Sequence, residues 1–196
     1  MVIYTIGHSN HEIERFVELL RTHAIAMVVD VRSSPFSKYC PQFDKELLPK
    51  LLAPHGIRYA FFGRELGGRP DGDEFYDDVG RALYERMAAS ERFRGGIAQL
   101  VADHGDGHAA LMCGEEDPAE CHRHLLLGRV LDAAGVEVRH IRGDGTVQTY
   151  RAVVEAAQKS ESGVLQLELF PAEEIDAWRS TRSVLPKKRP ASSSGR

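Results

Sequence analysis

Two cysteines, a glutamate and a histidine in one short segment carry the chemistry that this sequence suggests. Cys113 ends an apolar run, Cys121 follows after seven intervening residues, and Glu115 and His122 lie beside them. Thiol, carboxylate and imidazole groups act in proteins as nucleophiles, proton-transfer groups or metal ligands. We therefore expect Cys113, Glu115 and Cys121 to be catalytic, and Cys113, Cys121 and His122 to be a candidate set of ligands for a divalent metal.

The same residues also have plainer interpretations. A gap of seven residues between the cysteines is not a structural-zinc spacing, and each cysteine could be a small buried core residue. Asp117, Pro118 and Glu120 predict a helix start with a capping box. In a helix that starts there, Cys121 points away from Arg123, so the two thiols meet only if the helix begins later.

Two further candidate catalytic residues follow other apolar runs. His8 comes just after the first run and is either a general acid or base or a histidine hydrogen-bonded in a loop. Ser9 and Glu12 after it predict a second capping box. Asp30 ends a buried apolar run, where a carboxylate needs hydrogen-bond donors, which favours a role in a site.

Candidate substrate-binding residues occur in the same regions. The apolar stripe of the helix after Cys121 places Arg123 on the buried face, where its guanidinium needs an anionic partner. That partner is either Asp30 or Glu115, or an anionic group of the substrate. A glycine-rich loop after the third apolar run is long enough to form a flap. The candidate substrate-binding residues are Arg32, Glu65, Gly67, Gly68, His122 and Arg123.

Apolar runs alternate with helical patterns, which predicts the elements that position these residues. The expected strands are Val2 to Ile6, Ala26 to Val31, Ile57 to Phe62, Ala109 to Cys113 and Val136 to Ile141. The expected helices are Glu12 to His23, Asp44 to His55, Phe75 to Ala89, Glu91 to His104 and Pro118 to Ala134. This order predicts an α/β fold: a single three-layer domain with a central, mostly parallel sheet of about five strands and helices on both faces. The candidate residues then gather at the carboxyl ends of the strands.

Composition and charge limit the organisation of the 196-residue chain. We expect an α/β domain over residues 1–158, an extension over 159–180 and a basic, disordered tail over 181–196. The tail holds five of the basic residues and no acidic ones, which leaves 20 basic and 29 acidic residues elsewhere, a net charge of −9. The tail is a solvated segment or a nucleic-acid contact, and it carries no DNA-binding claim alone.

The sequence gives no sign of a membrane-bound or secreted protein. It has no run of about 18 apolar residues, and its N-terminus lacks the regions of a signal peptide. Its three cysteines are too few for a disulfide scaffold. We expect a cytoplasmic protein with no membrane contact.

An ordered series of short motifs resembles the domain of unknown function 488 family over about Val2 to Ile141. The resemblance implies the fold more firmly than a reaction, and the paired cysteines are what suggests an enzyme. The motifs are Thr5-Ile6-Gly7-His8-Ser9, Asp30-Val31-Arg32 with Pro35 and Ser37, Pro41-Gln42-Phe43, Gly56-Ile57-Arg58-Tyr59, Glu65-Leu66-Gly67-Gly68, Leu111-Met112-Cys113 with Glu115, Cys121-His122-Arg123 and Val138-Arg139-His140-Ile141.

A segment beyond this region is similar to the pentapeptide that binds the bacterial DNA sliding clamp. Its partner-binding residues would be Gln166, Leu167, Leu169 and Phe170. An extended peptide would place the last two in an apolar pocket, and a plain edge strand would show the same alternation.

The leading hypothesis is an enzyme, thiolate- or metal-dependent, that acts on nucleic acid or a nucleotide-like substrate in DNA maintenance. His8 and Glu115 would transfer protons, and Asp30 and Arg123 would form a charged pair that orients the site or holds a phosphate. One alternative is a rhodanese-like or redox thiol enzyme acting on small molecules. Another is a non-catalytic module that binds a ligand or a partner.

Overall fold

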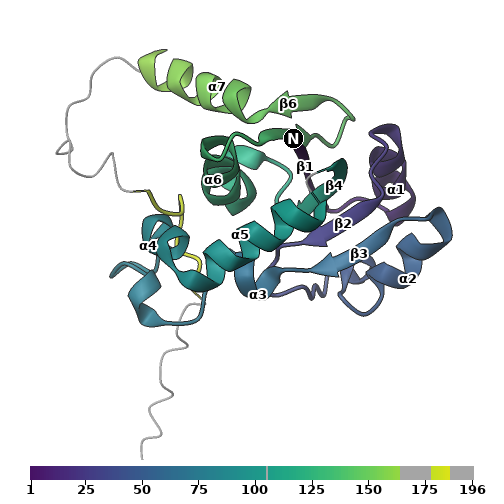
Figure 1. The fold of residues 1–196 in the computed structure, drawn as a ribbon, viewed down its shortest axis with the longest axis horizontal. Helices are drawn as coiled ribbons and strands as arrows, with labels where there is room; N and C mark the ends of the chain where they lie inside the picture. The colour runs from purple at the N-terminus through teal and green to yellow at the C-terminus, as the bar shows by residue number, and fades with distance from the viewer. Residues whose placement is uncertain (105, 164–177, 186–196) are drawn as a thin grey trace, which may run out of the picture.

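The structure is a computed structural model, and it describes residues 1–104, 106–163 and 178–185 (Figure 1). In these residues a six-stranded sheet has the order β3-β2-β4-β1-β5-β6. Only β6 runs antiparallel to its neighbour, so the expected mostly parallel α/β sheet is confirmed. The short, exposed β6 was not predicted because it lacks an apolar run. The strands are β1 (Val2–Gly7), β2 (Met27–Asp30), β3 (Arg58–Phe61), β4 (Asp106–Cys113), β5 (Glu137–Ile141) and β6 (Val147–Thr149).

Helices cover both faces of the sheet, as a three-layer α/β domain requires. None of those in the described residues is long and apolar enough to cross a membrane. The last helix runs past residue 158, where we expected the domain to end. The α-helices are α1 (Ile13–Thr22), α2 (Leu48–Leu52), α3 (Gly63–Leu66), α4 (Tyr84–Ala89), α5 (Glu91–His104), α6 (Arg129–Ala133) and α7 (Tyr150–Gly163). The 3-10 turns are Pro41–Phe43, Ala53–His55, Asp73–Phe75 and Pro118–Glu120, and Arg123–Gly128 forms a π-helix.

Side chains alternate along the buried strands, so the two faces of the sheet carry different residues. On β4, Leu111 and Cys113 pack with α4, α5 and α6, whereas Met112 packs with α1 and α2. On β2, Val29 belongs to the first of these cores. Because side chains alternate along a strand, its neighbour Asp30 points to the opposite face. The pleat therefore separates Cys113 from Asp30, although both lie at the same edge of the sheet.

The helix expected from Phe75 to Ala89 is wrong in its first half. Gly80 adopts φ 81°, and the Asp77 carboxylate accepts hydrogen bonds from the backbone of Val79 and Arg81. These bonds form a tight turn, so only Tyr84–Ala89 is helical. Aspartate and glycine at these positions are typical of turns, and that signal competed with the apolar periodicity.

The C-terminal segment 178–185 packs against this turn. The backbone N–H groups of Tyr84 and Val184 donate to the carbonyls of Trp178 and Gly80, at 2.9 and 3.0 Å, and the Trp178 indole donates to Leu125. Residues 181–185 therefore differ from the disordered tail that we expected to begin at residue 181. The sliding-clamp-like segment 166–170 lies outside the described residues.

Candidate functional site

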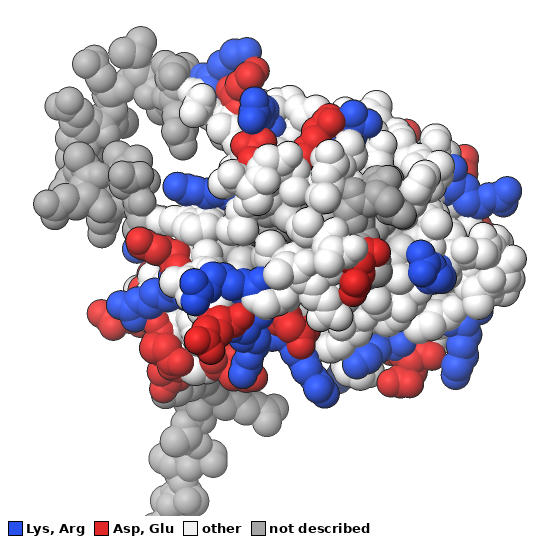
Figure 2. Space-filling view, viewed as in Figure 1, with Lys and Arg blue, Asp and Glu red and all other residues white. Residues whose placement is uncertain are grey.

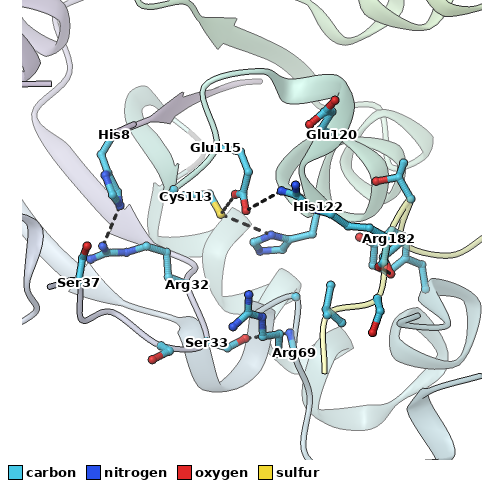
Figure 3. A pocket seen from close by; sticks show the side chains of 18 of the residues that line it. His8, Arg32, Ser33, Ser37, Arg69, Cys113, Glu115, Glu120, His122 and Arg182 are labelled. Carbon is cyan, nitrogen blue, oxygen red and sulfur yellow. Dashed lines mark hydrogen bonds and ion pairs between the residues drawn. The ribbon is translucent and has the colours of Figure 1, made fainter. Parts of the chain in front are cut away.

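A pocket of about 330 Å³ opens at the carboxyl ends of β1, β2 and β4 (Figure 3). Its lining comes from the segments that follow three strands, from the glycine-rich loop, from the start of α4 and from the C-terminal segment. Its lining residues are His8, Arg32, Ser33, Ser34, Phe36, Ser37, Gly68, Arg69, Tyr84, Cys113, Gly114, Glu115, Glu120, His122 and Ser180 to Val184.

We define the site cluster as Cys113, Glu115, Cys121 and His122; the first, second and fourth line the pocket, and Cys121 lies buried beside them. The Glu115 Oε2 atom is 3.0 Å from the Cys113 Sγ and 3.2 Å from the Cys121 Sγ. The His122 Nδ1 atom is 3.6 Å from the first sulfur and 3.8 Å from the second. The structure thus brings together the two thiols whose proximity the sequence left open.

The meeting of the thiols depends on a break in the helix that we expected from Pro118 to Ala134. Asp117 caps the start at Pro118 by accepting a hydrogen bond from the Ala119 backbone, but only one 3-10 turn follows. Cys121 is then extended, with φ −118° and ψ 141°. The next helical segment begins after this residue, so the phase of a single helix does not apply to Cys121.

Two glycines allow the backbone to approach the site cluster closely. A Cβ atom on Gly7 would lie 1.9 Å from the Glu115 carbonyl oxygen, and one on Gly68 would lie 2.8 Å from the Cγ of His122. Real Cβ atoms do not come so near. Gly68, which we expected to bind substrate, therefore supplies space for the His122 ring.

The thiols of the site cluster differ in acidity. A hydrogen bond from Cys121 and the neighbouring His122 lower the pKa of Cys113 to about 6, although burial opposes the change. Burial raises the pKa of Cys121, and the adjacent Cys113 raises it further. Cys113 is therefore the more acidic thiol of the pair, and the thiolate is the form in which a cysteine reacts or binds a metal.

The glutamate and the histidine favour their charged forms. Burial would raise the pKa of Glu115, but hydrogen bonds from the two thiols lower it to about 2. Burial would lower the pKa of His122, but Cys113 and Glu115 raise it. The His122 Nε2 atom lies 3.1 Å from the Val31 carbonyl oxygen. Because a carbonyl only accepts, this nitrogen carries a proton, and Nδ1 faces the sulfurs.

His8, Asp30 and Arg32 form one wall beside the site cluster. Asp30 is fully buried, and its carboxylate accepts hydrogen bonds from Arg32 Nε at 2.9 Å, Arg32 Nη2 at 2.6 Å and the Tyr59 hydroxyl at 2.8 Å. Arg32 Nη1 lies 3.0 Å from His8 Nε2. Burial and the Arg32 charge lower the pKa of His8 to about 4. Asp30 does not line the pocket, so it is a positioning residue for Arg32 and His8.

The expected pairing of Asp30 with Arg123 is wrong, because the Asp30 carboxylate bonds to Arg32 and Tyr59 instead. Arg123 is fully buried, and it donates to the backbone carbonyls of Glu115 and Glu116 at 3.0 and 2.5 Å. No ion pair of Arg123 occurs among the described residues. The guanidinium thus fixes the loop that carries Glu115 and is out of reach of a substrate.

The capping box expected at Ser9 and Glu12 is also wrong. Ser9 has φ 46°, and α1 begins after Glu12 without a side-chain cap. Glu65 and Gly67, which we expected to bind substrate, line a separate cavity beside α5.

The sequence reasoning missed several residues of the pocket. Ser33, Phe36 and Arg69 lie in loops that follow predicted elements, so their positions after a strand or in the glycine-rich loop were the available signal. Arg182 had no such signal, because it lies far from the other residues in the chain. Its Nη2 atom is 3.9 Å from Glu115 Oε1 (Figure 3).

The fold and this strand-end cluster place the protein among α/β domains with a polar site at the carboxyl edge of the sheet. Residues 12–130 match the sequence profile of the family described as "Domain of unknown function DUF488". The chain therefore belongs to that family. The matched region holds the whole site cluster, while His8 and segment 178–185 lie outside it. No curated protein and no solved structure matches the chain significantly.

Proposed function

We propose that the protein is an enzyme that acts on a nucleotide or a similar phosphate-bearing substrate, with the site cluster as its reacting groups. One observation carries this proposal: the thiol, carboxylate and imidazole groups lie under a pocket whose rim holds arginine, serine and aromatic side chains. A volume of about 330 Å³ lies in the range of small-molecule sites.

The rim offers contacts for both parts of a nucleotide. The exposed Arg69 and the hydroxyls of Ser33, Ser34 and Ser37 can donate to phosphate oxygens. Phe36 lines the pocket with 61% of its surface exposed, as a platform for stacking a base would. Glu120 and Arg69 lie on opposite sides of His122 in Figure 3. We therefore assign the phosphate to the side of Arg69.

The charge distribution favours a nucleotide over a DNA duplex. A surface that binds duplex phosphates is strongly basic, whereas residues 1–180 carry a net charge of −9. On the face seen in Figure 2, basic and acidic side chains are interspersed. A small pocket with a few cations is a better match for one nucleotide.

Calorimetric titration with nucleoside monophosphates and inorganic pyrophosphate tests the assignment of the rim. Arg69→Gln should weaken both ligands at least tenfold, since an arginine to phosphate bond contributes more than about 1.4 kcal/mol. Phe36→Ala should weaken the nucleotides and spare pyrophosphate, which has no base to stack.

Matched controls come from exposed residues outside the pocket. Arg21→Gln on α1 and Tyr39→Ala, whose side chain is 95% exposed, should bind as the wild type does. Equal affinities in the wild type and Arg69→Gln, or no binding of any probe, would reject the proposal. For a nucleotide that binds, chromatography of products should show at least a hundredfold slower turnover in Cys113→Ala and Glu115→Gln.

A second candidate is a dithiol enzyme that acts on small molecules. The two sulfurs lie within 4.8 Å of each other, so a modest approach would form a disulfide by thiol–disulfide exchange, in which a small-molecule disulfide substrate takes the two electrons and two protons and leaves as two thiols. The rhodanese-like version is less favoured. The strand-end motif Asp30-Val31-Arg32 suggests it, but the side chains of Asp30 and Arg32 bind each other. A mass 2 Da lower after mild oxidation, absent in Cys121→Ser, would support the dithiol.

The setting in DNA maintenance stays a prediction that depends on residues 166–170. Calorimetry with a bacterial sliding clamp should show binding that Leu169→Ala with Phe170→Ala abolishes. Equal affinity of the double variant would reject recruitment to the clamp and leave the nucleotide proposal intact.

A further inference from the structure

We propose that Cys113, Cys121 and His122 bind one divalent transition metal ion, with zinc as the best fit, at the floor of the pocket. The inference deepens the proposed function, on whose reacting groups it rests. In the described residues, the three ligand atoms lie within 4.8 Å of one another, and all three side chains are buried.

The distances match those around a tetrahedral ion. With Zn–S bonds of about 2.3 Å and Zn–N bonds of about 2.0 Å, a sulfur and a nitrogen ligand lie about 3.5 Å apart. The His122 Nδ1 atom is 3.6 Å from the Cys113 Sγ and 3.8 Å from the Cys121 Sγ. An ion can therefore enter between these atoms without movement of the backbone.

The orientation of the His122 ring is fixed in the way that is typical of metal-binding histidines. Its Nε2–H points to the Val31 carbonyl at 3.1 Å, and its ring packs against Gly68. Metal-binding histidines almost always donate their second N–H in this way, which fixes the ring and directs the other lone pair to the ion.

The carboxylate of Glu115 adds negative charge beside the metal ligands. Its Oε2 atom accepts hydrogen bonds from the two thiols at 3.0 and 3.2 Å, and once both thiols are deprotonated, the carboxylate would repel them unless a cation lies between. Around a dication, all of these groups are attracted to the same point. The soft pair of thiolates with one imidazole selects zinc over magnesium or calcium.

Binding by only three protein ligands would leave the metal ion able to bind water or substrate in the pocket. Zinc sites with three protein ligands keep a position for water or substrate, and zinc lowers the pKa of its water to near neutrality. Glu115 lines the pocket, where its carboxylate would take one proton from a water that attacks a phosphorus atom of the nucleotide-like substrate. The new O–P bond would replace the P–O bond to the leaving group, whose oxygen would then take up a proton from solvent, so the reaction would be hydrolysis of a phosphoester or phosphoanhydride.

Metal binding to the full chain without a histidine tag tests the site. Metal-free, reduced protein should bind about one Zn²⁺ in competition with a chromophoric chelator. Cys113→Ser, Cys121→Ser and His122→Gln should each bind it at least a hundredfold more weakly, since even outer contacts of a metal site contribute up to about a hundredfold. Cys40→Ser is the matched control, because Cys40 is buried in the other core, and it should bind Zn²⁺ as the wild type does.

Two further readouts keep the test decisive if a variant fails to fold. Co²⁺ bound to the wild type should give a thiolate-to-cobalt absorption band, and Zn²⁺ should raise the Tm of the wild type and of Cys40→Ser. No such band in the reduced wild type, or equal Zn²⁺ affinity in Cys113→Ser, would overturn the metal site.

Nucleotide titrations of the metal-free protein separate this inference from the proposed function. If Arg69-dependent nucleotide binding persists while the wild type binds no metal, only the metal site is rejected. If one Zn²⁺ binds and no nucleotide or pyrophosphate binds at either metal content, the nucleotide substrate is rejected and the metal site stands.

Discussion

His122 and His124 are two residues apart in the chain, yet they belong to clusters of opposite character. His122 faces two thiols and a carboxylate under the pocket. His124 belongs to the buried histidine cluster, which we define as Thr5, His124 and His140. There, His124 Nδ1 lies 3.1 Å from His140 Nε2, and Thr5 Oγ1 lies 2.7 Å from His140 Nδ1.

The two clusters differ in hydrogen-bond partners, in position relative to the pocket and in protonation, and these differences distinguish a candidate functional cluster from a structural one. In the buried histidine cluster, both ring nitrogens of His140 have a hydrogen-bond partner, Thr5 for one and His124 for the other. None of these three residues lines the pocket. Burial lowers the pKa of His124 to about 4 and that of His140 to about 2, so both rings are neutral near pH 7. In the site cluster, by contrast, two thiols, a carboxylate and an imidazole face one another beside the pocket. The first arrangement stabilises the fold, and the second is the one for which we propose a ligand.

Replacement of Arg123, which lies between the two histidines in the chain, should have the largest effect. Arg123→Met leaves two buried carbonyls without their donor and should lower the free energy of unfolding by about 3 to 5 kcal/mol. Urea denaturation measures this loss, with Arg94→Met on the exposed face of α5 as a control within about 0.5 kcal/mol. A loss below about 1 kcal/mol would contradict the assigned role.

Acidification should weaken the buried histidine cluster next. The unfolded state takes up a proton near pH 6.5, whereas burial keeps His140 neutral down to about pH 2. Stability is therefore complete above about pH 7 and falls as the pH drops below 6.5, by about 3 kcal/mol at pH 4 for this residue. Denaturation at several pH values should show a shallower fall in His140→Gln than in the wild type. Parallel curves would show that His140 does not titrate on unfolding.

Loss of one hydroxyl in the same cluster should have a smaller effect. Thr5→Val removes the hydrogen bond to His140 Nδ1 at nearly constant volume, and should lower the free energy of unfolding by about 1 kcal/mol. Denaturation at pH 7 measures it, and an unchanged midpoint would show that the bond contributes nothing.

The smallest effect on stability should come from the site cluster itself. Cys121→Ser replaces the thiol with a hydroxyl that can still donate to Glu115, and should change the free energy of unfolding of the metal-free protein by less than about 1 kcal/mol. A loss comparable to that of Arg123→Met would erase the contrast between the clusters, because it would make the site cluster structural.

The sequence predicts the strands better than it predicts the site. Runs such as Val2 to Ile6 form strands because they are apolar and β-branched, and this signal is local. The position of Cys121 depends instead on one extended residue inside a segment of helical character. Asp30 pairs with Arg32, two residues away, whereas Arg123 bonds to backbone carbonyls; the sequence does not distinguish these partners. Arg182 joins the pocket only through tertiary packing.

Segment 178–185 adds to the pocket from outside the region that defines the family. The site cluster lies within that region, residues 12–130, whereas residues 180–184 of the pocket lining lie beyond it. A change limited to residues 180–184 would alter the size and charge of what enters without touching the thiols or the imidazole. The pocket is therefore closed in part by a stretch outside the region that defines the family, while Phe36 and Arg69, which also line it, lie within that region.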